Sequence, residues 1–290
     1  MNVTVLLLVL SSALVNAYWN FILKKSINKG ADKILLYWLS NVTGVIIYFV
    51  LFIFLIINYK ISYEGFVLAI LCGLFFSIYI FSLSKSYELS DLSHAYPLSK
   101  TTPLFTLLIG IFYLNENITA TAFVGIALVI FGVYAIHLKS FRFKDFLNPI
   151  LKSKGSIFAL LTAIISAMYG LIFKISTTKI NPFIFVYMSY FFMLIFYTPF
   201  LFLKSKSIIS QIKKYRKEII KIGVLDMLGA YLLIAALALS QLSYVFALRQ
   251  IGVLFNVIGG TYFFKEKHGK ARLIASLIMI FGIFLIIINT

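Results

Sequence analysis

The sequence predicts an all-α polytopic membrane protein in which ten transmembrane helices form two inverted five-helix repeats. Three observations support this prediction: an apolar composition, ten apolar stretches long enough to cross a bilayer, and a similarity between the two halves of the chain. Hydrophobic residues make up 62% of the 290 residues and charged residues only 12%, and the mean hydropathy is +1.02. Such a chain cannot cover its surface with polar side chains, so it must fold in lipid.

Ten stretches are long and apolar enough to be transmembrane helices. A bilayer core about 30 Å thick needs roughly 20 apolar residues per helix, and the strict alternation of membrane β-barrel strands is absent. The first stretch also resembles a signal peptide, but no basic residue precedes it, and Lys24 and Lys25 follow it. The expected helices cover residues 3–23, 34–57, 65–86, 91–114, 119–138, 156–177, 183–203, 220–241, 243–264 and 270–289.

The basic residues predict the orientation of these helices. Most of the 26 Lys and Arg residues lie in the loops after the first, third, fifth, seventh and ninth helices. The positive-inside rule puts these loops in the cytoplasm, so both termini are expected on the non-cytoplasmic side of a plasma (inner) membrane. This topology also accounts for the net charge of +17, and no nucleic-acid partner is expected.

The loop between the seventh and eighth helices has a helical pattern of its own. Apolar residues recur there at helical spacing among four basic residues. Such a segment is typical of an amphipathic helix that lies at the membrane interface and contacts anionic lipids. The apolar positions are Ile208, Ile209, Ile212, Tyr215, Ile219 and Ile220, and the basic ones are Lys213, Lys214, Arg216 and Lys217.

The sequence offers no support for an enzyme or a metalloprotein. The single cysteine, Cys72, lies inside an expected helix and cannot form an intrachain disulfide. The three histidines show no metal-ligand spacing, and no glycine-rich phosphate loop joins a strand to a helix. We therefore expect no cofactor, no metal and no enzymatic activity. Energy for any transport would come from a gradient or from exchange.

The two halves of the chain are similar when one is shifted by 150 residues. Each half has five expected helices, an odd number, so the second half must cross the membrane in the opposite direction. We expect a first repeat at 1–138, a cytoplasmic linker at 139–155 and a second repeat at 156–290, with a substrate site near the midplane where the repeats meet. The shift pairs Ala17 with Ala167, Lys24 with Lys174, Tyr37 with Tyr187, Gly73 with Gly223, Ser93 with Ser243, Glu116 with Glu266 and Gly132 with Gly282.

Two basic residues lie inside expected helices, Lys100 in the fourth and Arg249 in the ninth. A charge near the middle of a membrane helix costs about 2.5–3.5 kcal/mol on insertion scales and usually faces a cavity. The shift pairs Arg249 with Ser99, so the two cations occupy near-equivalent positions, and Ser99 is expected to contact the substrate as well. Two cations favour a carboxylate, phosphate or phosphonate group, which Arg can bind through two hydrogen bonds. The alternative is that both cations bind backbone carbonyls and only brace the bundle.

Other residues are candidates for the transport path. Pro97 and Pro103 remove backbone donors and are expected to bend the fourth helix, which makes it a candidate gate or hinge. Asp226 is a candidate coupling carboxylate or counter-ion for the lysine of the fourth helix; the alternative is a solvated residue at a helix start. Tyr96 and Tyr231 are expected to line the pocket.

Glu116 and Glu266 are paired by the repeat and lie in short turns between consecutive helices. An acid at or just before a helix start can accept hydrogen bonds from free backbone N–H groups. We therefore expect a structural role for both.

These features together resemble the drug/metabolite transporter superfamily, and specifically its ten-helix EamA-type members. The resemblance covers essentially the whole chain. Part of it is similar to a subgroup with a basic residue in both the fourth and ninth helices, which has Arg where this chain has Lys100 and an acid where it has Gln250. The residues that carry the resemblance are the run from Tyr96 to Leu104, Glu116 and Glu266, Gly132 and Gly282, Trp19-Asn20 with Lys24, and Ala247-Leu248-Arg249.

The resemblance implies alternating-access transport of small metabolites, with the third, fourth, eighth and ninth helices lining a central path. Together with the two cations, it predicts a secondary active transporter of a small anionic metabolite, and it favours export. The partners would be that substrate and the lipid bilayer, and the protein would act as a monomer or homodimer. Two alternatives stay open: a flippase for a lipid-linked phosphosugar, and a membrane sensor or scaffold that transports nothing.

Overall fold

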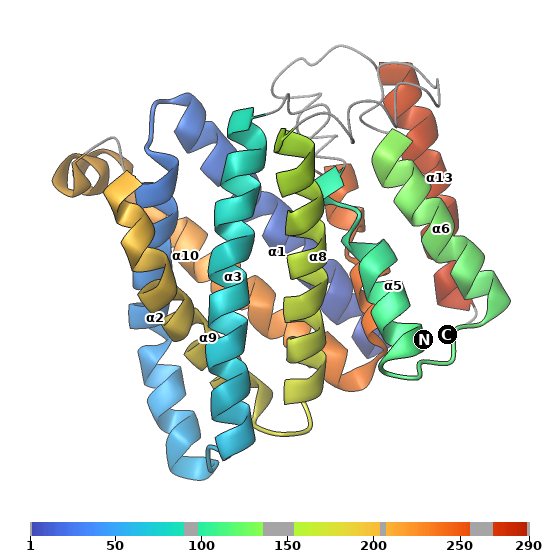
Figure 1. The fold of residues 1–290 in the computed structure, drawn as a ribbon, viewed down its shortest axis with the longest axis horizontal. Helices are drawn as coiled ribbons and strands as arrows, with labels where there is room; N and C mark the ends of the chain where they lie inside the picture. Colours follow the sequence, from blue (N-terminus) through green and yellow to red (C-terminus); the bar gives the residue numbers. More distant parts are fainter. Residues whose placement is uncertain (1, 90–97, 136–153, 204–206, 256–268, 289–290) are drawn as a thin grey trace. The chain divides into compact units, whose positions relative to one another are not determined.

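The computed structural model is all-helical and describes residues 2–89, 98–135, 154–203, 207–255 and 269–288. Each of the ten predicted spans contains one α-helix in these described ranges, which confirms the predicted fold class (Figure 1). The helices are α1 (Val3–Asn28), α2 (Lys33–Asn58), α3 (Tyr63–Leu89), α5 (Thr102–Phe112), α6 (Ala120–Ala135), α8 (Lys154–Ser176), α9 (Pro182–Tyr197), α10 (Ile208–Leu239), α11 (Leu242–Leu248) and α13 (Gly269–Ile288), with a 3-10 helix, η1 (Thr198–Leu203), after α9.

The helices differ in length. Six of those described are long and apolar enough to cross a membrane, namely α1, α2, α3, α8, α9 with its 3-10 extension, and α10. The other four are shorter apolar helices. Two of the short ones, α5 and α11, are fragments of spans that the sequence predicts as continuous, 91–114 and 243–264.

Polar caps and prolines set the helix ends in several places. Asp32 begins α2 by accepting hydrogen bonds from the N–H groups of Ile34 and Leu35, and Asn181 caps α9 in the same way with Pro182 in the first turn. Asn and Asp are preferred at this position because their side chains satisfy otherwise free backbone donors. Pro199 follows the end of α9, where the chain tightens into η1, because proline cannot donate the next helical bond.

The chain forms two compact units, and each unit combines segments from both halves of the sequence. Unit 1 contains residues 1–10, 78–171 and 239–290, and unit 2 contains residues 11–77 and 172–238. These boundaries differ from the predicted repeat boundaries, and they fall inside α1, α3 and α8 and near the end of α10.

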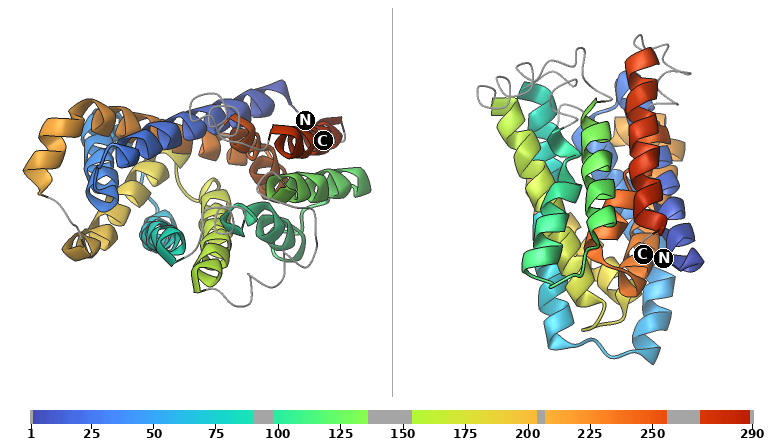
Figure 2. Two further views of the ribbon diagram at one scale, coloured as in Figure 1. Left: turned by 90° about the horizontal axis from the view of Figure 1, so that it is seen from above. Right: turned by 90° about the vertical axis from the view of Figure 1, so that its right-hand side faces the viewer.

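In unit 1, α6 and α13 pack along each other, as Figure 1 and the right-hand view of Figure 2 show. A Cβ atom on Gly282 would lie 2.6 Å from the carbonyl oxygen of Gly125, and one on Gly132 would lie 2.9 Å from that of Ala275. The contact position rises along α6 as it falls along α13, so the helices are antiparallel. The shift of 150 residues exchanges Gly132 with Gly282 and Gly125 with Ala275. The equivalent helices of the two repeats therefore meet in a two-fold contact of opposite direction.

Unit 2 repeats this kind of contact between other equivalent helices. A Cβ atom on Gly44 of α2 would lie 2.9 Å from the carbonyl oxygen of Gly223 in α10. Its counterpart contact joins α3 to α9, where a Cβ atom on Gly73 would lie 2.7 Å from the backbone nitrogen of Met193. Small residues that let helix backbones approach are a common basis of helix association in membranes. The two-fold relation thus extends to the helices of unit 2.

We predict that Gly282→Ala lowers the thermal unfolding midpoint of the detergent-purified protein. The new methyl group would overlap the backbone of α6, and overpacking of this kind costs typically about 1–3 kcal/mol. Gly229→Ala is the matched control, because its Cβ would lie 3.5 Å from the nearest atom, an ordinary contact, and alanine favours the helix. Equal midpoints for the two variants would contradict the close α6–α13 contact.

Candidate functional site

The fourth span is broken at Lys100. Leu98 and Ser99 are helical, Lys100 is in a turn, and α5 starts only at Thr102 with Pro103 in its first turn. Both the backbone nitrogen and the hydroxyl of Thr101 donate to the carbonyl oxygen of Leu98, at 3.2 and 2.7 Å. The predicted bend at Pro103 is therefore a break that precedes the proline, and Pro103 begins a new helix.

The ninth span is broken at Arg249. Helix α11 ends at Leu248, Arg249 and Gln250 form a turn, and helical structure resumes over residues 251–255. Backbone bonds from Gly252 to Arg249 and from Val253 to Gln250 span three residues, as in a 3-10 turn, at 3.1 and 2.8 Å. The segment contains no proline, so the sequence gives no direct signal for this break.

The two breaks occupy equivalent positions in the repeats, because the shift of 150 residues pairs Arg249 with Ser99 and Gln250 with Lys100. Both cations belong to unit 1 and are half-buried. They are close enough that the charge of Arg249 acts on Lys100. We call Lys100 and Arg249 the two-cation site. Ser99, which precedes Lys100, is 4% exposed.

Glu116 holds the start of α11 on the opposite side from Arg249. Its carboxylate accepts hydrogen bonds from the backbone nitrogens of Leu242 and Ser243 and from the Ser243 hydroxyl, the last at 2.6 Å. The turn after α5 orients Glu116 through Asn115, which has a φ of 51°. A Cβ atom on Gly110 would overlap both the Glu116 carboxylate and the Ser243 hydroxyl. The predicted structural role is confirmed, but the helix that Glu116 caps is α11 and not the next one along the chain.

A wall of aromatic residues positions another face of α11. Tyr169 of α8 packs against Phe246 of α11 with ring centroids 6.4 Å apart, and against Tyr79 of α3 at 5.7 Å. The Ser166 hydroxyl donates to the Tyr169 hydroxyl at 3.2 Å. These residues belong to unit 1, and sequence reasoning did not select them because tyrosine is common in this chain.

Asp226 is buried in unit 2. It lies well inside α10, is 6% exposed, and its Oδ2 accepts a hydrogen bond from the Tyr37 hydroxyl at 3.3 Å. Tyr190 donates to its backbone carbonyl at 3.3 Å, and the Tyr37 ring packs against Tyr197 with centroids 6.0 Å apart. The alternative of a solvated residue at a helix start is therefore wrong, because α10 begins at Ile208.

Tyr231 also lies in α10, and its side chain is 5% exposed. Its ring packs against Tyr48 and Phe183, with centroids 5.2 and 5.6 Å apart. The hydroxyl has no hydrogen-bond partner among the residues that the structure describes. Buried hydroxyls are normally hydrogen-bonded, so Tyr231 has capacity for a further polar contact.

The sequence was compared with known families and structures. A family model described as "EamA-like transporter family" matches residues 3–138 and again residues 153–288. The chain belongs to the EamA-like transporter family. Comparison with curated proteins gives no match. A solved structure titled "Crystal structure of protein" is similar over 100% of this chain and 98% of its own, with a TM-score of 0.80 and 14% identity, which shows the shared fold.

Membership of the EamA-like family confirms the predicted resemblance and a multi-pass membrane transporter with two copies of the family domain. Of the predicted site residues, unit 1 brings together Ser99, Lys100 and Arg249. Asp226 and Tyr231 belong to unit 2. Tyr96, Pro97 and Glu266 lie outside the described residues.

We predict that Glu116→Ala lowers the thermal unfolding midpoint, because α11 loses the acceptor for its first N–H groups, a loss that typically costs about 0.5–2 kcal/mol. Glu64→Gln is the control, since Glu64 pairs with Lys179 at 2.7 Å on an exposed surface, where an ion pair contributes roughly 0–1 kcal/mol. A smaller loss for Glu116→Ala than for Glu64→Gln would contradict the capping role.

Proposed function

We propose that this EamA-like transporter is a secondary active carrier that binds a small anionic metabolite at the two-cation site and moves it by alternating access. The observation that carries the proposal is the occurrence of both cations at the breaks of equivalent helices in unit 1. The substrate class is a small molecule with a carboxylate, phosphate or phosphonate group.

The charge argument is the first support. Two like charges within reach of each other inside an apolar bundle raise the energy of the empty site, because each is partly removed from water and repels the other. An anionic group between them would offset both costs. A neutral or cationic substrate would offset neither, so the site selects by charge.

The types of the two cations support an oxyanion ligand. A guanidinium can form two parallel hydrogen bonds to a carboxylate or phosphate, whereas a lysine ammonium acts as a flexible point charge. Arg249 would therefore orient the oxyanion, and Lys100 would add charge from the equivalent position of the other repeat. The hydroxyl of Ser99, next to Lys100, offers a further polar contact.

The helix breaks support movement at this site. Discontinuous helices near the midplane are the usual binding elements of inverted-repeat transporters. Each break gives its helix two parts joined by a few residues whose dihedral angles can change. Rocking of the halves would then expose the two-cation site alternately, and we propose export across the inner membrane with both termini outside the cytoplasm.

Asp226 is proposed as the proton-coupling carboxylate. An ionisable residue buried in a membrane helix is costly and is commonly part of a proton path. The Tyr37 hydroxyl stabilises its ionised form through a hydrogen bond, and removal of that charge by protonation would change the local packing of unit 2. Transport and proton movement would thereby be linked.

We predict that Lys100→Ala and Arg249→Ala each lower counterflow of an anionic substrate in proteoliposomes. Loss of a charged hydrogen bond should reduce exchange by about tenfold or more at low substrate concentration. The assay uses a panel of amino acids, phosphorylated and phosphonate metabolites, nucleotides and cations. Lys174→Met is the matched control, because Lys174 is also a cation in an apolar helix but donates to the Leu237 carbonyl at 2.7 Å in unit 2; its exchange should change less than twofold.

Other outcomes of this panel would contradict the proposal. Exchange of a neutral or cationic solute that both alanine variants retain would make the two cations structural braces. Translocation of a lipid-linked phosphosugar with no exchange of soluble solutes would favour a flippase. Absence of all flux from folded protein would favour a sensor or scaffold.

We predict that Asp226→Asn abolishes accumulation driven by a pH gradient while substrate exchange at equal pH continues. The amide keeps the size and hydrogen bonding of the side chain but cannot exchange a proton. The control is Glu218→Gln, which neutralises another acid of α10, and it should retain driven accumulation. Full driven accumulation in Asp226→Asn would exclude Asp226 as the coupling group.

A further inference from the structure

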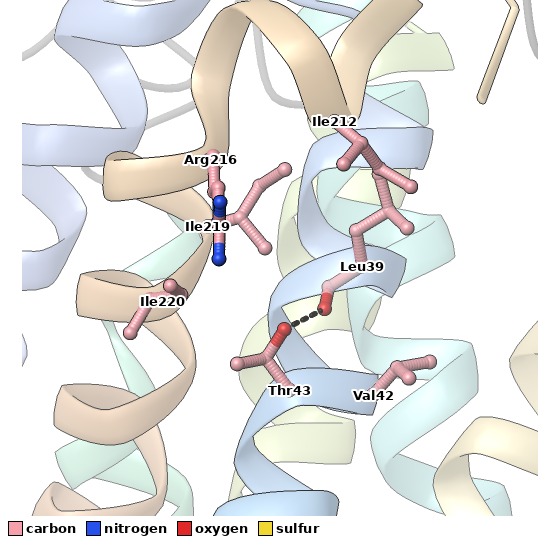
Figure 3. Close-up of a pocket in the computed structure, with 7 residues that line it drawn as sticks. All are labelled: Leu39, Val42, Thr43, Ile212, Arg216, Ile219 and Ile220. Carbon is pink, nitrogen blue, oxygen red and sulfur yellow. Dashed lines mark hydrogen bonds between the residues drawn. The ribbon is translucent and has the colours of Figure 1, made fainter. Parts of the chain in front are cut away.

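A groove lies between α2 and α10 in unit 2, near the end of the helices that is close to the basic loops. Leu39, Val42 and Thr43 of α2 form one side of it, and Figure 3 shows α10 residues facing them. The volume of the groove is about 320 Å³. The Thr43 hydroxyl donates to the Leu39 carbonyl at 2.9 Å, so the polar atom of this wall is already satisfied and the wall is effectively apolar.

The α10 side of the groove combines apolar residues with one cation. Ile212, Arg216, Ile219 and Ile220 share one face of the helix at successive turns. Ile212 and Ile220 are 42% and 40% exposed, which in a membrane protein means contact with lipid. The groove is therefore open to the bilayer along its length and charged at one position.

Local contacts hold the charged part of α10 in place. Tyr215 interrupts the helix with φ −121° and ψ 22°, and its hydroxyl donates to the Lys29 carbonyl at 2.7 Å. The Gln211 side chain accepts a hydrogen bond from the Asp32 backbone at 3.0 Å. The predicted amphipathic segment is thus tied to the loop between α1 and α2 and runs directly into the membrane helix, which fixes Arg216 at the groove.

We propose that the α2–α10 groove binds one anionic phospholipid, with the phosphate at Arg216 and an acyl chain along Leu39, Val42 and Ile220. Arg216 is exposed and forms no ion pair with a carboxylate in the part of the chain that the structure describes. Its guanidinium can form paired hydrogen bonds to a phosphate group. Lys213 and Lys217 are exposed nearby on α10 and add positive charge that attracts anionic lipid to this surface.

A lipid fits this groove better than a soluble anion does. A soluble phosphate would leave the apolar wall in contact with lipid and would gain nothing from it. A phospholipid matches both parts, because its chain adds contact with the isoleucines while its phosphate meets the cation at the membrane surface. The site is independent of the two-cation site and of the proposed transport substrate.

The experiment is native mass spectrometry of the delipidated full-length protein in detergent, titrated with dioleoyl phosphatidylglycerol. We expect one tightly bound lipid, and no comparable binding of dioleoyl phosphatidylcholine. Arg216→Gln should reduce occupancy by about tenfold, since it removes a charged hydrogen bond. Val42→Phe should reduce it as well by filling the groove without a change in charge, whereas the control Lys217→Gln, which removes a neighbouring charge outside the groove, should change it less than twofold.

Three results would overturn the proposal. Equal losses in Arg216→Gln and Lys217→Gln would mean diffuse attraction to a basic surface. Full binding in Val42→Phe would mean that no chain enters the groove. Equal binding of glycerophosphoglycerol, which has the headgroup but no acyl chains, would mean a site for soluble phosphate only. Unfolding midpoints of all variants within about 2 °C of wild type ensure that each result reports on the site.

Discussion

The cost of placing two positive charges in an apolar helical bundle is the constraint that the rest of the site depends on. Lys100 and Arg249 do not lie in continuous helices; each lies where its helix is broken. A break frees backbone groups, which is costly in lipid unless they find partners, and Thr101 supplies one by bonding to the Leu98 carbonyl. The fold thus combines two expensive features, charge and broken helix, at one place in each repeat, where a substrate can gain from both.

The inverted repeat explains why the two features come in pairs. In the α6–α13 contact the glycine positions are exchanged by the shift of 150 residues, so the two halves use the same contact in opposite directions. An inverted repeat places equivalent residues at matching depths from opposite sides of the membrane. Glu116 departs from this economy by a long-range contact, because it caps α11, whose first residue is 126 positions away along the chain. This cap fixes the end of the helix that leads to Arg249.

Much of the fold and part of the site could be predicted from the sequence. The apolar stretches are long enough to identify ten helices, and the cost of an intramembrane charge identifies Lys100 and Arg249. The break at Arg249 could not be predicted, because Gln250 and Ile251 give no helix-breaking signal and tertiary contacts decide the local geometry. The wall formed by Tyr169 and Phe246 was also missed, since packing between distant helices leaves no local pattern. The burial of Asp226 was missed because the amphipathic segment before it runs on as one helix, α10.

Charge selection at the two-cation site can be measured without a known substrate. Cys72, the single cysteine, is free and buried, so a Cys72→Ala background that contains Lys100→Cys has one reporter thiol. Its reaction rates with an anionic and a cationic methanethiosulfonate, each divided by the rate with a free thiol in solution, measure the local potential. The account predicts that the anionic reagent is favoured by about tenfold and that Arg249→Gln removes this preference. A preference for the cationic reagent, or one that Arg249→Gln leaves unchanged, would contradict a shared anion site.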